Sequence, residues 1–402
     1  MKRVTNLCIA LLMALSSVAT LHAQEPDKSW LNVYGFAMLD TGYNAKQIDP
    51  NWYDTVRPTK LPAFKDQFGP DGNWYSGVRQ TRFGVKAGTP TELGEVFTQF
   101  EFELFGTGVD AGQTTFRLRH AYAELGQFGA GQTWSPFMDI DVFPNSLEYW
   151  GPTGMVFFRN VQVRWMPIKG DTRMTFALER PGASADQGDY AGRVELQGVK
   201  PHFPYPDLSA EYRYGEKWGY VEAAGIVRKM EWKDMNNDAL NLSGSATGWG
   251  LNLSSNIKFG ANADVLRLSY VFGAGIQNYM NDAPVDVGIE KNPGNATTPI
   301  KGKALPLTGI VAFLDHNWNP KFSSSIGYSN IDIKNSDGQT PDAFHKGEYA
   351  LANLLWTPVK NFMVGWEVQW GKRHNFEDGF TSDIFKVQFS AKANFSKMFG
   401  GS

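Results

Sequence analysis

The connections between strands constrain this chain more than any other feature of its sequence. Sixteen segments alternate apolar with polar residues and are bounded by Gly, Pro, Asn or Asp, a pattern typical of β-strands. Seven connections between them are short, eight are longer, and the two kinds alternate strictly. Outer-membrane barrels have this arrangement, with tight periplasmic turns and long external loops. The predicted strands are Leu31–Tyr43, Gln80–Gly88, Gly94–Phe105, Thr114–Leu125, Gln127–Thr133, Asn160–Met166, Thr172–Arg180, Asp207–Tyr214, Trp218–Trp232, Ser245–Lys258, Asp264–Ala274, Leu307–Trp318, Phe322–Ile331, Gly347–Thr357, Asn361–Lys372 and Asp383–Phe395.

The last of these segments shows the alternation most clearly. Phe385, Val387 and Phe389 alternate with Lys386 and Gln388. A closed barrel in lipid needs apolar side chains outside and polar side chains inside. A soluble antiparallel sheet alternates in the same way, but sixteen such strands with alternating loop lengths favour the membrane. We therefore predict an all-β fold, a 16-stranded antiparallel transmembrane β-barrel with both termini on the periplasmic side.

The composition excludes several other classes of protein. Outside the N-terminal signal described next, no apolar run approaches the ~20 residues that a transmembrane helix requires. Charged residues make up 20% of the chain and aromatic residues 14%, which suits a barrel in lipid. Without Lys2 and Arg3 of the signal, 36 basic residues (38 minus 2) stand against 41 acidic ones, so no nucleic-acid partner is expected. The single cysteine, Cys8, also lies in the signal, which excludes disulfides and thiol chemistry from the mature chain.

The first 23 residues resemble a secretory signal peptide. Lys2 and Arg3 provide the positive start, Cys8–Leu15 a short apolar core, and Leu21–Ala23 a small residue before a cleavage site at Gln24. An amphipathic N-terminal helix is the alternative. We expect a signal peptide over residues 1–23, a barrel over residues 24–402, and a location in the bacterial outer membrane.

Strand parity predicts a basic wall inside the barrel. Arg117 and Arg119 alternate with Phe116 and Leu118, and an arginine on the lipid face would cost about 2–4 kcal/mol at the bilayer midplane. His120 falls on the opposite face and is expected outside or at a subunit contact. Parity places Arg82, Lys86, Arg117, Arg119, Arg164 and Arg173 in the lumen, together with the acids Glu101 and Glu103.

Such a wall favours anionic solutes, because a low-dielectric channel focuses the field of its charges. Arginine also binds a carboxylate or phosphate through two parallel hydrogen bonds. The alternative is a solvated wall that Glu101 and Glu103 balance, with no charge preference.

The long connection Trp134–Gly154 is unusually apolar for an external loop, since it is rich in Phe, Trp, Met and Pro. We predict that it folds into the barrel and narrows the pore. Trp134 belongs to this constriction loop, and Asp139, Asp141 and Glu148 are the candidate acids facing the basic wall. An extracellular cap or a subunit contact is the alternative.

Several motifs in this part of the chain are similar to those of the DcaP-like porins. They are Arg117–Tyr122, Gly131–Asp139, Val142–Pro144, Gly151–Gly154 and the segment Arg159–Arg164. The resemblance implies a trimeric sixteen-stranded outer-membrane barrel that takes up dicarboxylates and related small organic anions. It assigns the family's characteristic arginines to Arg117, Arg119, Arg159 and Arg164, and its inserted loop to Gly131–Gly154.

The predicted function is therefore that of an outer-membrane porin, a passive diffusion channel that prefers small organic anions such as dicarboxylates. A general diffusion porin and a sugar- or phosphate-preferring porin are the alternatives within this class. An outer-membrane enzyme and a soluble adhesion module are the alternatives outside it, although the six histidines are scattered without a catalytic motif. Small anionic solutes, outer-membrane lipid, lipopolysaccharide and two further copies in a homotrimer are the expected partners; no cofactor or metal is expected.

Overall fold

The computed structural model describes residues 28–186, 188–190, 199–235, 239–261 and 263–401. The predicted signal peptide, residues 1–23, lies outside the described residues. The division at residue 24 therefore stays a prediction.

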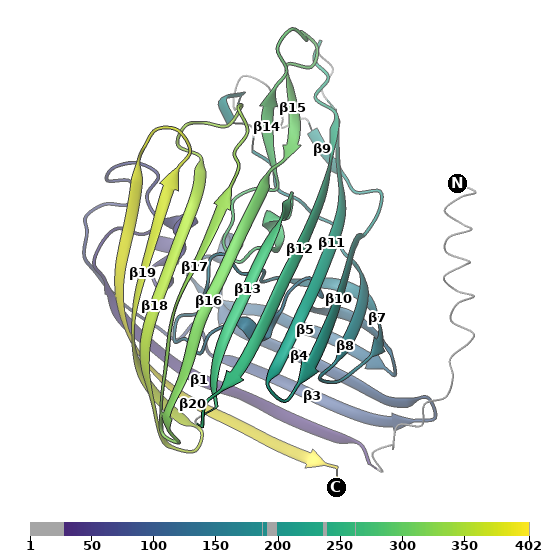
Figure 1. Cartoon of the computed structure of the whole chain (residues 1–402), viewed down its shortest axis with the longest axis vertical. Coiled ribbons are helices and arrows are strands. Elements are labelled where there is room, and N and C mark those ends of the chain that lie inside the picture. The colour runs from purple at the N-terminus through teal and green to yellow at the C-terminus, as the bar shows by residue number, and fades with distance from the viewer. Residues whose placement is uncertain (1–27, 187, 191–198, 236–238, 262, 402) are drawn as a thin grey trace.

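The chain forms a closed antiparallel barrel of sixteen strands (Figure 1). The first and last strands close it by pairing along the whole of Trp30–Asn44. The barrel strands are β1 (Trp30–Asn44), β3 (Arg82–Thr91), β4 (Gly94–Phe105), β5 (Thr114–Leu125), β6 (Phe128–Trp134), β7 (Arg159–Ile168), β8 (Arg173–Glu179), β10 (Asp207–Glu216), β11 (Gly219–Asp234), β12 (Gly244–Phe259), β13 (Asp264–Ala274), β16 (Pro306–Asn319), β17 (Phe322–Ile333), β18 (Phe344–Val359), β19 (Phe362–Asn375) and β20 (Thr381–Gly400).

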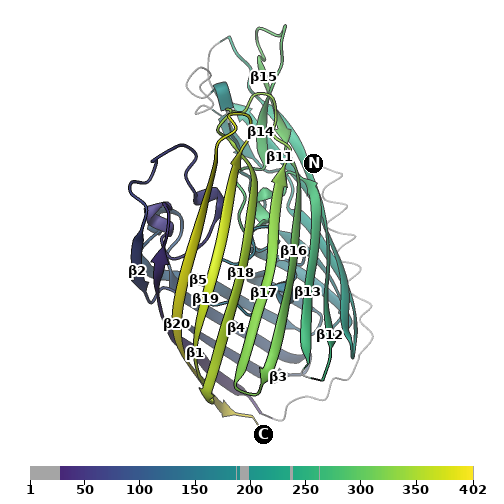
Figure 2. The same ribbon diagram turned by 60° about the vertical axis from the view of Figure 1, so that its left-hand side comes forward.

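All sixteen predicted strands are confirmed, and the short turns lie at one end of the barrel with the long loops at the other (Figures 1 and 2). The long loops also contain short strands and 3-10 turns that were not predicted. The short strands pair with neighbouring strands or with each other and are not part of the closed barrel. These elements are β2 (Asn73–Gly77), β9 (Val199–His202), β14 (Val287–Lys291), β15 (Ile300–Ala304) and the 3-10 turns η2 (Pro50–Trp52), η3 (Pro58–Lys60), η4 (Gly108–Asp110), η5 (Ile140–Val142), η6 (Gly188–Tyr190) and η8 (Gln277–Tyr279).

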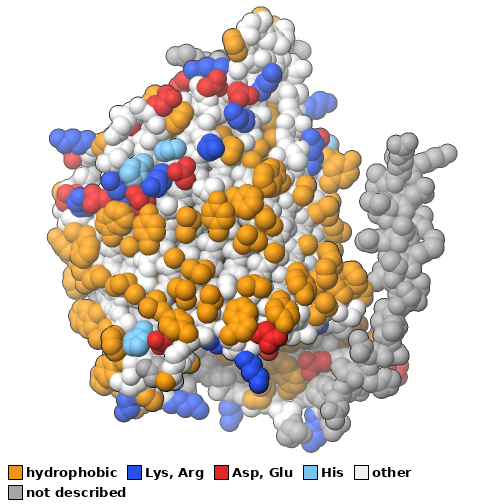
Figure 3. Space-filling view, in the orientation of Figure 1, with side chains coloured by type: hydrophobic (Ala, Val, Ile, Leu, Met, Phe, Trp, Pro, Cys, Tyr) orange, Lys and Arg blue, Asp and Glu red, His pale blue; other side chains and the backbone are white. Residues whose placement is uncertain are grey.

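The outer face of the barrel carries a broad apolar band with charged side chains above and below it (Figure 3). Trp218, Trp318 and Trp356 are exposed beside the short turns, where an indole ring meets both lipid and headgroups. The band is what a strand that alternates apolar-out and polar-in must produce. Among the described residues, no helix is both long and apolar enough to cross a membrane.

One side of the lumen is apolar rather than polar, which the sequence alternation did not predict. Inward side chains of β11, β13 and β16–β18 pack against apolar side chains of residues 135–158, the loop between β6 and β7. Each fully buried side chain of this kind contributes roughly 1.5–3 kcal/mol. The members from the wall include Ile226, Val271, Val311, Phe313 and Ile331, and those from the loop include Phe137, Met138, Val142, Met155 and Val156. The loop therefore fills this side of the barrel.

Candidate functional site

The loop of residues 135–158 crosses the lumen and binds strands on the other side of the barrel. The backbone N–H of Leu147 donates to Glu367 on β19 (2.7 Å), and that of Gly154 donates to the hydroxyl of Ser329 on β17 (2.9 Å). The prediction that this segment folds into the barrel is confirmed.

Gly154 brings the loop into backbone contact with the wall. A β-carbon on Gly154 would lie 1.8 Å from the carbonyl oxygen of Asn330, and one on Gly309 would lie 2.3 Å from the carbonyl oxygen of Gly154. No side chain fits at such distances, so glycine at both positions allows the loop to lie directly on β16 and β17.

Six charged side chains on β3, β4, β5 and the start of β7 form the first polar feature of the lumen. We call it the Glu103 cluster: Arg82, Glu101, Glu103, Arg117, Arg119 and Arg159. The carboxylate of Glu103 lies 3.3 Å from Arg82, 3.6 Å from Arg117, 2.7 Å from Arg119 and 3.9 Å from Arg159. Four arginines therefore share two glutamates, and the cluster carries an excess of positive charge.

A β-bulge directs two consecutive residues of β5, Arg119 and His120, to the inside of the barrel. Glu101 on β4 pairs with His120, whereas its neighbour Phe102 pairs with Leu118, so Arg119 is an extra residue in β5. A bulge bends its strand and shifts the alternation of side chains by one residue. Arg119 can then donate to both glutamates of the cluster, at 2.6 and 2.7 Å.

His120 consequently faces inward, and the prediction that it lies outside or at a subunit contact is wrong. Its Nδ1 is 3.0 Å from the hydroxyl of Thr133, and its ring meets Trp134 edge-on at 5.0 Å. The error arose because inward and outward side chains were assumed to alternate without interruption through the bulge.

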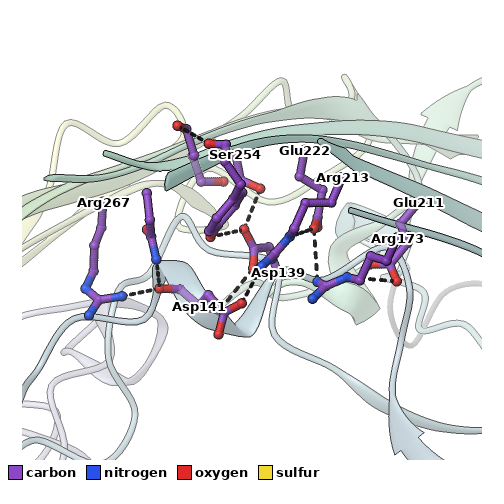
Figure 4. Close-up of polar contacts among 12 residues, drawn as sticks. Asp139, Asp141, Arg173, Glu211, Arg213, Glu222, Ser254 and Arg267 are labelled. Carbon is purple, nitrogen blue, oxygen red and sulfur yellow. Dashed lines mark hydrogen bonds and ion pairs between the residues drawn. The ribbon is translucent and has the colours of Figure 1, made fainter. Parts of the chain in front are cut away.

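A second group of charges lines β8, β10 and β11 and meets the loop (Figure 4). We call it the Arg213 network: Asp139, Asp141, Arg173, Glu211, Arg213 and Glu222. Arg213 donates to Asp139, Asp141 and Glu222, each at 2.6 Å. Arg173 reaches Glu222 at 3.0 Å and Glu211 at 3.3 Å. Here four carboxylates share two arginines, the reverse of the Glu103 cluster.

The structure separates the cations of the predicted basic wall, and Arg159 of the family resemblance, into several places. Arg82, Arg117, Arg119 and Arg159 meet in the Glu103 cluster, and Arg173 belongs to the Arg213 network. Lys86 lies 5.3 Å from the ring of Tyr34, beside the Glu103 cluster. Arg164 donates to the carbonyl oxygen of Trp134 (2.6 Å), so it holds the first turn of the loop. The ring of Trp134 itself lies 5.3 Å from Arg119 and 5.0 Å from Arg159.

Asp139 and Glu148 anchor the loop from buried positions, whereas Asp141 adds a half-exposed ion pair. Among the described residues, none of the three is paired with a cation of the predicted wall. Asp139 accepts hydrogen bonds from Arg213, from the hydroxyl of Tyr220 (2.7 Å) and from the hydroxyl of Ser254 (2.6 Å). Asp141 binds Arg213 with a side chain that is 47% exposed. Glu148 turns away from the pore and accepts from the backbone N–H of Val56 (3.0 Å) and from that of Gly151.

Burial raises the pKa of Glu148 to about 7, although Lys386 and the two N–H donors oppose the shift and Glu367 adds to it. When folding raises the pKa of a group, that group stabilises the folded protein at pH values below its ordinary pKa. This contribution to stability is lost as the pH rises through the pKa of the folded state. We expect the wild-type protein to lose stability relative to Glu148→Gln as the pH rises from 5 to 8. Thermal unfolding of both proteins across this range tests the expectation, and a constant difference in unfolding temperature would contradict it.

Most carboxylates of both groups are buried, as are Arg119, Arg159 and Arg213, whereas the other three arginines reach the lumen. In the Glu103 cluster and the Arg213 network, all acids except Asp141 are at most 8% exposed. Arg82, Arg117 and Arg173 keep 25%, 29% and 28% of their side chains exposed. A solute in the lumen therefore meets guanidinium groups before it meets most carboxylates.

Sequence reasoning missed Arg213 and Arg57. Arg213 follows Ser209 and Glu211 on the polar face of its strand, so the parity that identified Arg173 could have found it. Arg57 lies in an irregular loop without any periodic signal, yet it donates to Asp282, 225 residues later, at 2.9 Å. Only the folded chain brings those two loops together.

No group of three or more His, Cys, Asp or Glu side chains is arranged to hold a metal ion in the part of the chain that the structure describes. His316 and His374 are on the outward faces of their strands, and each lies 2.8 Å from one carboxylate, that of Asp264 and that of Glu348. The polar chemistry of the lumen is that of arginines and carboxylates.

Known structures share this fold. The chain superposes on the crystal structure of the outer membrane channel DcaP of Acinetobacter baumannii with a TM-score of 0.74 and 21% identity, covering 94% of this chain and 100% of that one. An anion-selective porin from Comamonas acidovorans matches with a TM-score of 0.60 and 11% identity over 91% and 100%. The trimer form of OmpT from Vibrio cholerae matches with a TM-score of 0.55 and 13% identity over 92% and 100%. None of the curated proteins matches this chain.

A family model identifies the chain more specifically than these folds do. The model described as "DcaP outer membrane protein" matches residues 74–395, which includes β3 to β19, β20 as far as Phe395, and both charged groups of the lumen. The protein is accordingly a channel of the outer membrane. It belongs to the DcaP outer membrane protein family.

Proposed function

We propose that this channel is a passive porin that prefers small organic anions such as dicarboxylates. The observation that carries the proposal is the burial of carboxylates beside partly exposed arginines in the lumen. Because the lumen is narrowed by the loop and walled by protein, charges there act in a lower dielectric than bulk water. The anion selectivity of the Comamonas porin and the channel activity of the Acinetobacter protein support the proposal by analogy.

Both charged groups contain arginines rather than lysines, which also favours carboxylates as the solutes. A planar guanidinium presents two parallel N–H groups that match both oxygens of one carboxylate. Arg82 and Arg117 both lie within 4 Å of Glu103, so they present adjacent donors to the lumen. A homotrimer is part of the proposal, supported by the trimer form of the structurally similar Vibrio protein.

A general diffusion porin without charge preference is the second candidate. The Arg213 network favours it, because four acids there outnumber two arginines and Asp141 is well exposed. If this network governs passage, its charges cancel the excess of the Glu103 cluster.

Solute entry into proteoliposomes distinguishes these candidates. Light scattering after mixing with iso-osmotic sodium succinate, erythritol or putrescine hydrochloride reports the rate of entry of an anion, a neutral solute and a cation. The proposal predicts that succinate enters fastest once size is taken into account. Equal rates for all three would favour the general porin, and faster putrescine would overturn the proposal.

Arg117→Gln is expected to lower the rate of succinate entry roughly two- to threefold while leaving erythritol unchanged, because it removes one exposed charge from the lumen. The same light-scattering assay measures it. Arg180→Gln, which alters an exposed arginine at the end of β8 outside both charged groups, is the matched control. If the rate of succinate entry is unchanged in folded Arg117→Gln, the Glu103 cluster does not determine the preference for anions.

A further inference from the structure

A second segment enters the barrel besides the loop of residues 135–158. It comprises residues 49–61, in the connection between β1 and β2, and we call it the brace. Val56 and Leu61 of the brace are each 1% exposed, and both belong to the apolar core that fills one side of the lumen. Loops at the end of a barrel usually run over its surface, so this burial shows that the brace is inserted.

Two glycines of the wall give the brace its place. Gly347 on β18 and Gly371 on β19 are both buried. A β-carbon on Gly371 would lie 2.5 Å from Cγ1 of Val56, and one on Gly347 would lie 2.7 Å from Cβ of Pro58. Any larger residue would have to push the brace away from the wall, so glycine at both positions allows it to lie directly on β18 and β19.

On its other side the brace holds residues 148–151 of the loop between β6 and β7. The backbone N–H of Val56 donates to the carboxylate of Glu148 (3.0 Å). The guanidinium carbon of Arg57 lies 4.1 Å from the ring centroid of Trp52 and 4.0 Å from that of Trp150, and the two rings meet edge-on. Trp52 belongs to the brace and Trp150 to the loop, so these cation–π contacts join the two segments.

The carboxylate of Asp282 ties both segments to a third loop, the one between β13 and β14. Its side chain is 1% exposed and accepts from Nε of Arg57 (2.9 Å) and from both the backbone N–H (2.9 Å) and the hydroxyl (2.5 Å) of Thr59. The neighbouring carbonyl oxygen of Asn281 accepts from Nε1 of Trp150 (2.7 Å). Three segments that are far apart in the sequence therefore meet at one buried carboxylate.

The residues that the brace holds in place border open space in the lumen. Arg57, Tyr149 and Trp150 all line a cavity of about 300 Å³. Tyr149 stacks on Phe105 with 3.8 Å between the ring centroids, and its hydroxyl donates to Glu103. A brace that moved outward would free this half of the loop, and the open cross-section beside the Glu103 cluster would increase.

We propose that the brace is a second size-setting element of the pore, with Asp282 as the positioning residue that keeps it closed on residues 148–151. The size limit of the channel then depends on two inserted segments rather than on the loop of residues 135–158 alone. The inference rests on the passive channel of the proposed function but not on its preference for anions, because the entry of neutral solutes depends on pore width.

The neutral solutes erythritol, arabinose, glucose and sucrose are the probes, and light scattering of proteoliposomes measures their rates of entry. In Asp282→Ala, which removes three hydrogen bonds to the brace, we expect the ratio of the sucrose rate to the erythritol rate to rise several-fold. Asp71→Ala is the matched control and should leave the ratio unchanged, since Asp71 is exposed in the same connection and accepts from the backbone N–H of Gln47 (3.2 Å). An unchanged ratio in Asp282→Ala that retains the heat-modifiable migration of a folded barrel overturns the proposal.

A reversible cross-link tests the same claim within one protein, and it serves if Asp282→Ala fails to fold. Thr59→Cys combined with Asp282→Cys places two thiols at side chains that are in contact, and the one native cysteine, Cys8, lies in the predicted signal peptide. The oxidised protein should keep the wild-type ratio, because the disulfide replaces the lost hydrogen bonds. Reduction with dithiothreitol should then raise the ratio several-fold.

Two results of the cross-linking experiment would overturn the brace: equal ratios before and after reduction, or no disulfide on oxidation. Failure of the proposed function gives a different result. Wild-type protein that admits none of the four neutral solutes would contradict the passive channel itself, whereas faster entry of putrescine than of succinate would contradict only the preference for anions.

Discussion

Replacing Asp139 with alanine is expected to release the middle of the loop from the wall and to increase single-channel conductance. Asp139 is fully buried and accepts hydrogen bonds from Arg213, Tyr220 and Ser254. Its removal takes away three buried hydrogen bonds to a charged group, each contributing about 1.5–3 kcal/mol, although Arg213 keeps Asp141 and Glu222 as partners. The barrel strands do not depend on this carboxylate, so the barrel should persist while the loop opens.

Asp141→Ala is the matched control for this experiment. Asp141 is two residues away and binds the same arginine, but its side chain is 47% exposed. Exposed ion pairs contribute about 0–1 kcal/mol, so the loop should stay in place. Planar-bilayer recording of both variants measures the effect, together with protease cleavage within residues 135–158. Equal conductance in Asp139→Ala and Asp141→Ala would contradict the assignment of Asp139 as the anchor.

Arg119→Ala is expected to have the second large effect, on the stability of the barrel rather than on its selectivity. Arg119 is buried and donates to both Glu101 and Glu103. Without it, two buried carboxylates share the weaker contacts of Arg82, Arg117 and Arg159. The loss should approach about 3 kcal/mol, the lower end of the range for a broken buried pair.

Unfolding in urea, followed by tryptophan fluorescence, measures this loss. Arg117→Ala is the control, since Arg117 is 3.6 Å from Glu103 and more exposed. It should shift the unfolding midpoint little and act mainly on solute entry. A midpoint that moves equally in both variants would show that burial does not separate the structural from the solute-facing arginines.

The barrel could be predicted from the sequence because the alternation of apolar and polar residues in each strand indicates which face meets lipid. Phe385 and Lys386 illustrate this: one is exposed to lipid and the other is fully buried inside. Loop lengths then fixed the number of strands and their direction. The inward fold of the loop followed from the apolar character of residues such as Phe137 and Leu147, which are both buried in the structure.

The candidate site could be predicted less completely from the sequence, for two physical reasons. The bulge at Arg119 depends on pairing with β4, so no pattern within β5 reveals that His120 turns inward. The partners of loop residues are set by tertiary contact over long separations, as with Arg57 and Asp282. Parity identifies which charges can enter the lumen, but not which of them are buried.

The central claim is that buried acids beside partly exposed arginines make the channel prefer anions. The reversal potential of the wild-type protein in a planar bilayer, with a tenfold gradient of potassium chloride, tests it most directly. The account predicts a potential of the sign that chloride permeation produces, decreasing in Arg117→Gln. A potential of zero or of the sign that potassium permeation produces would contradict it.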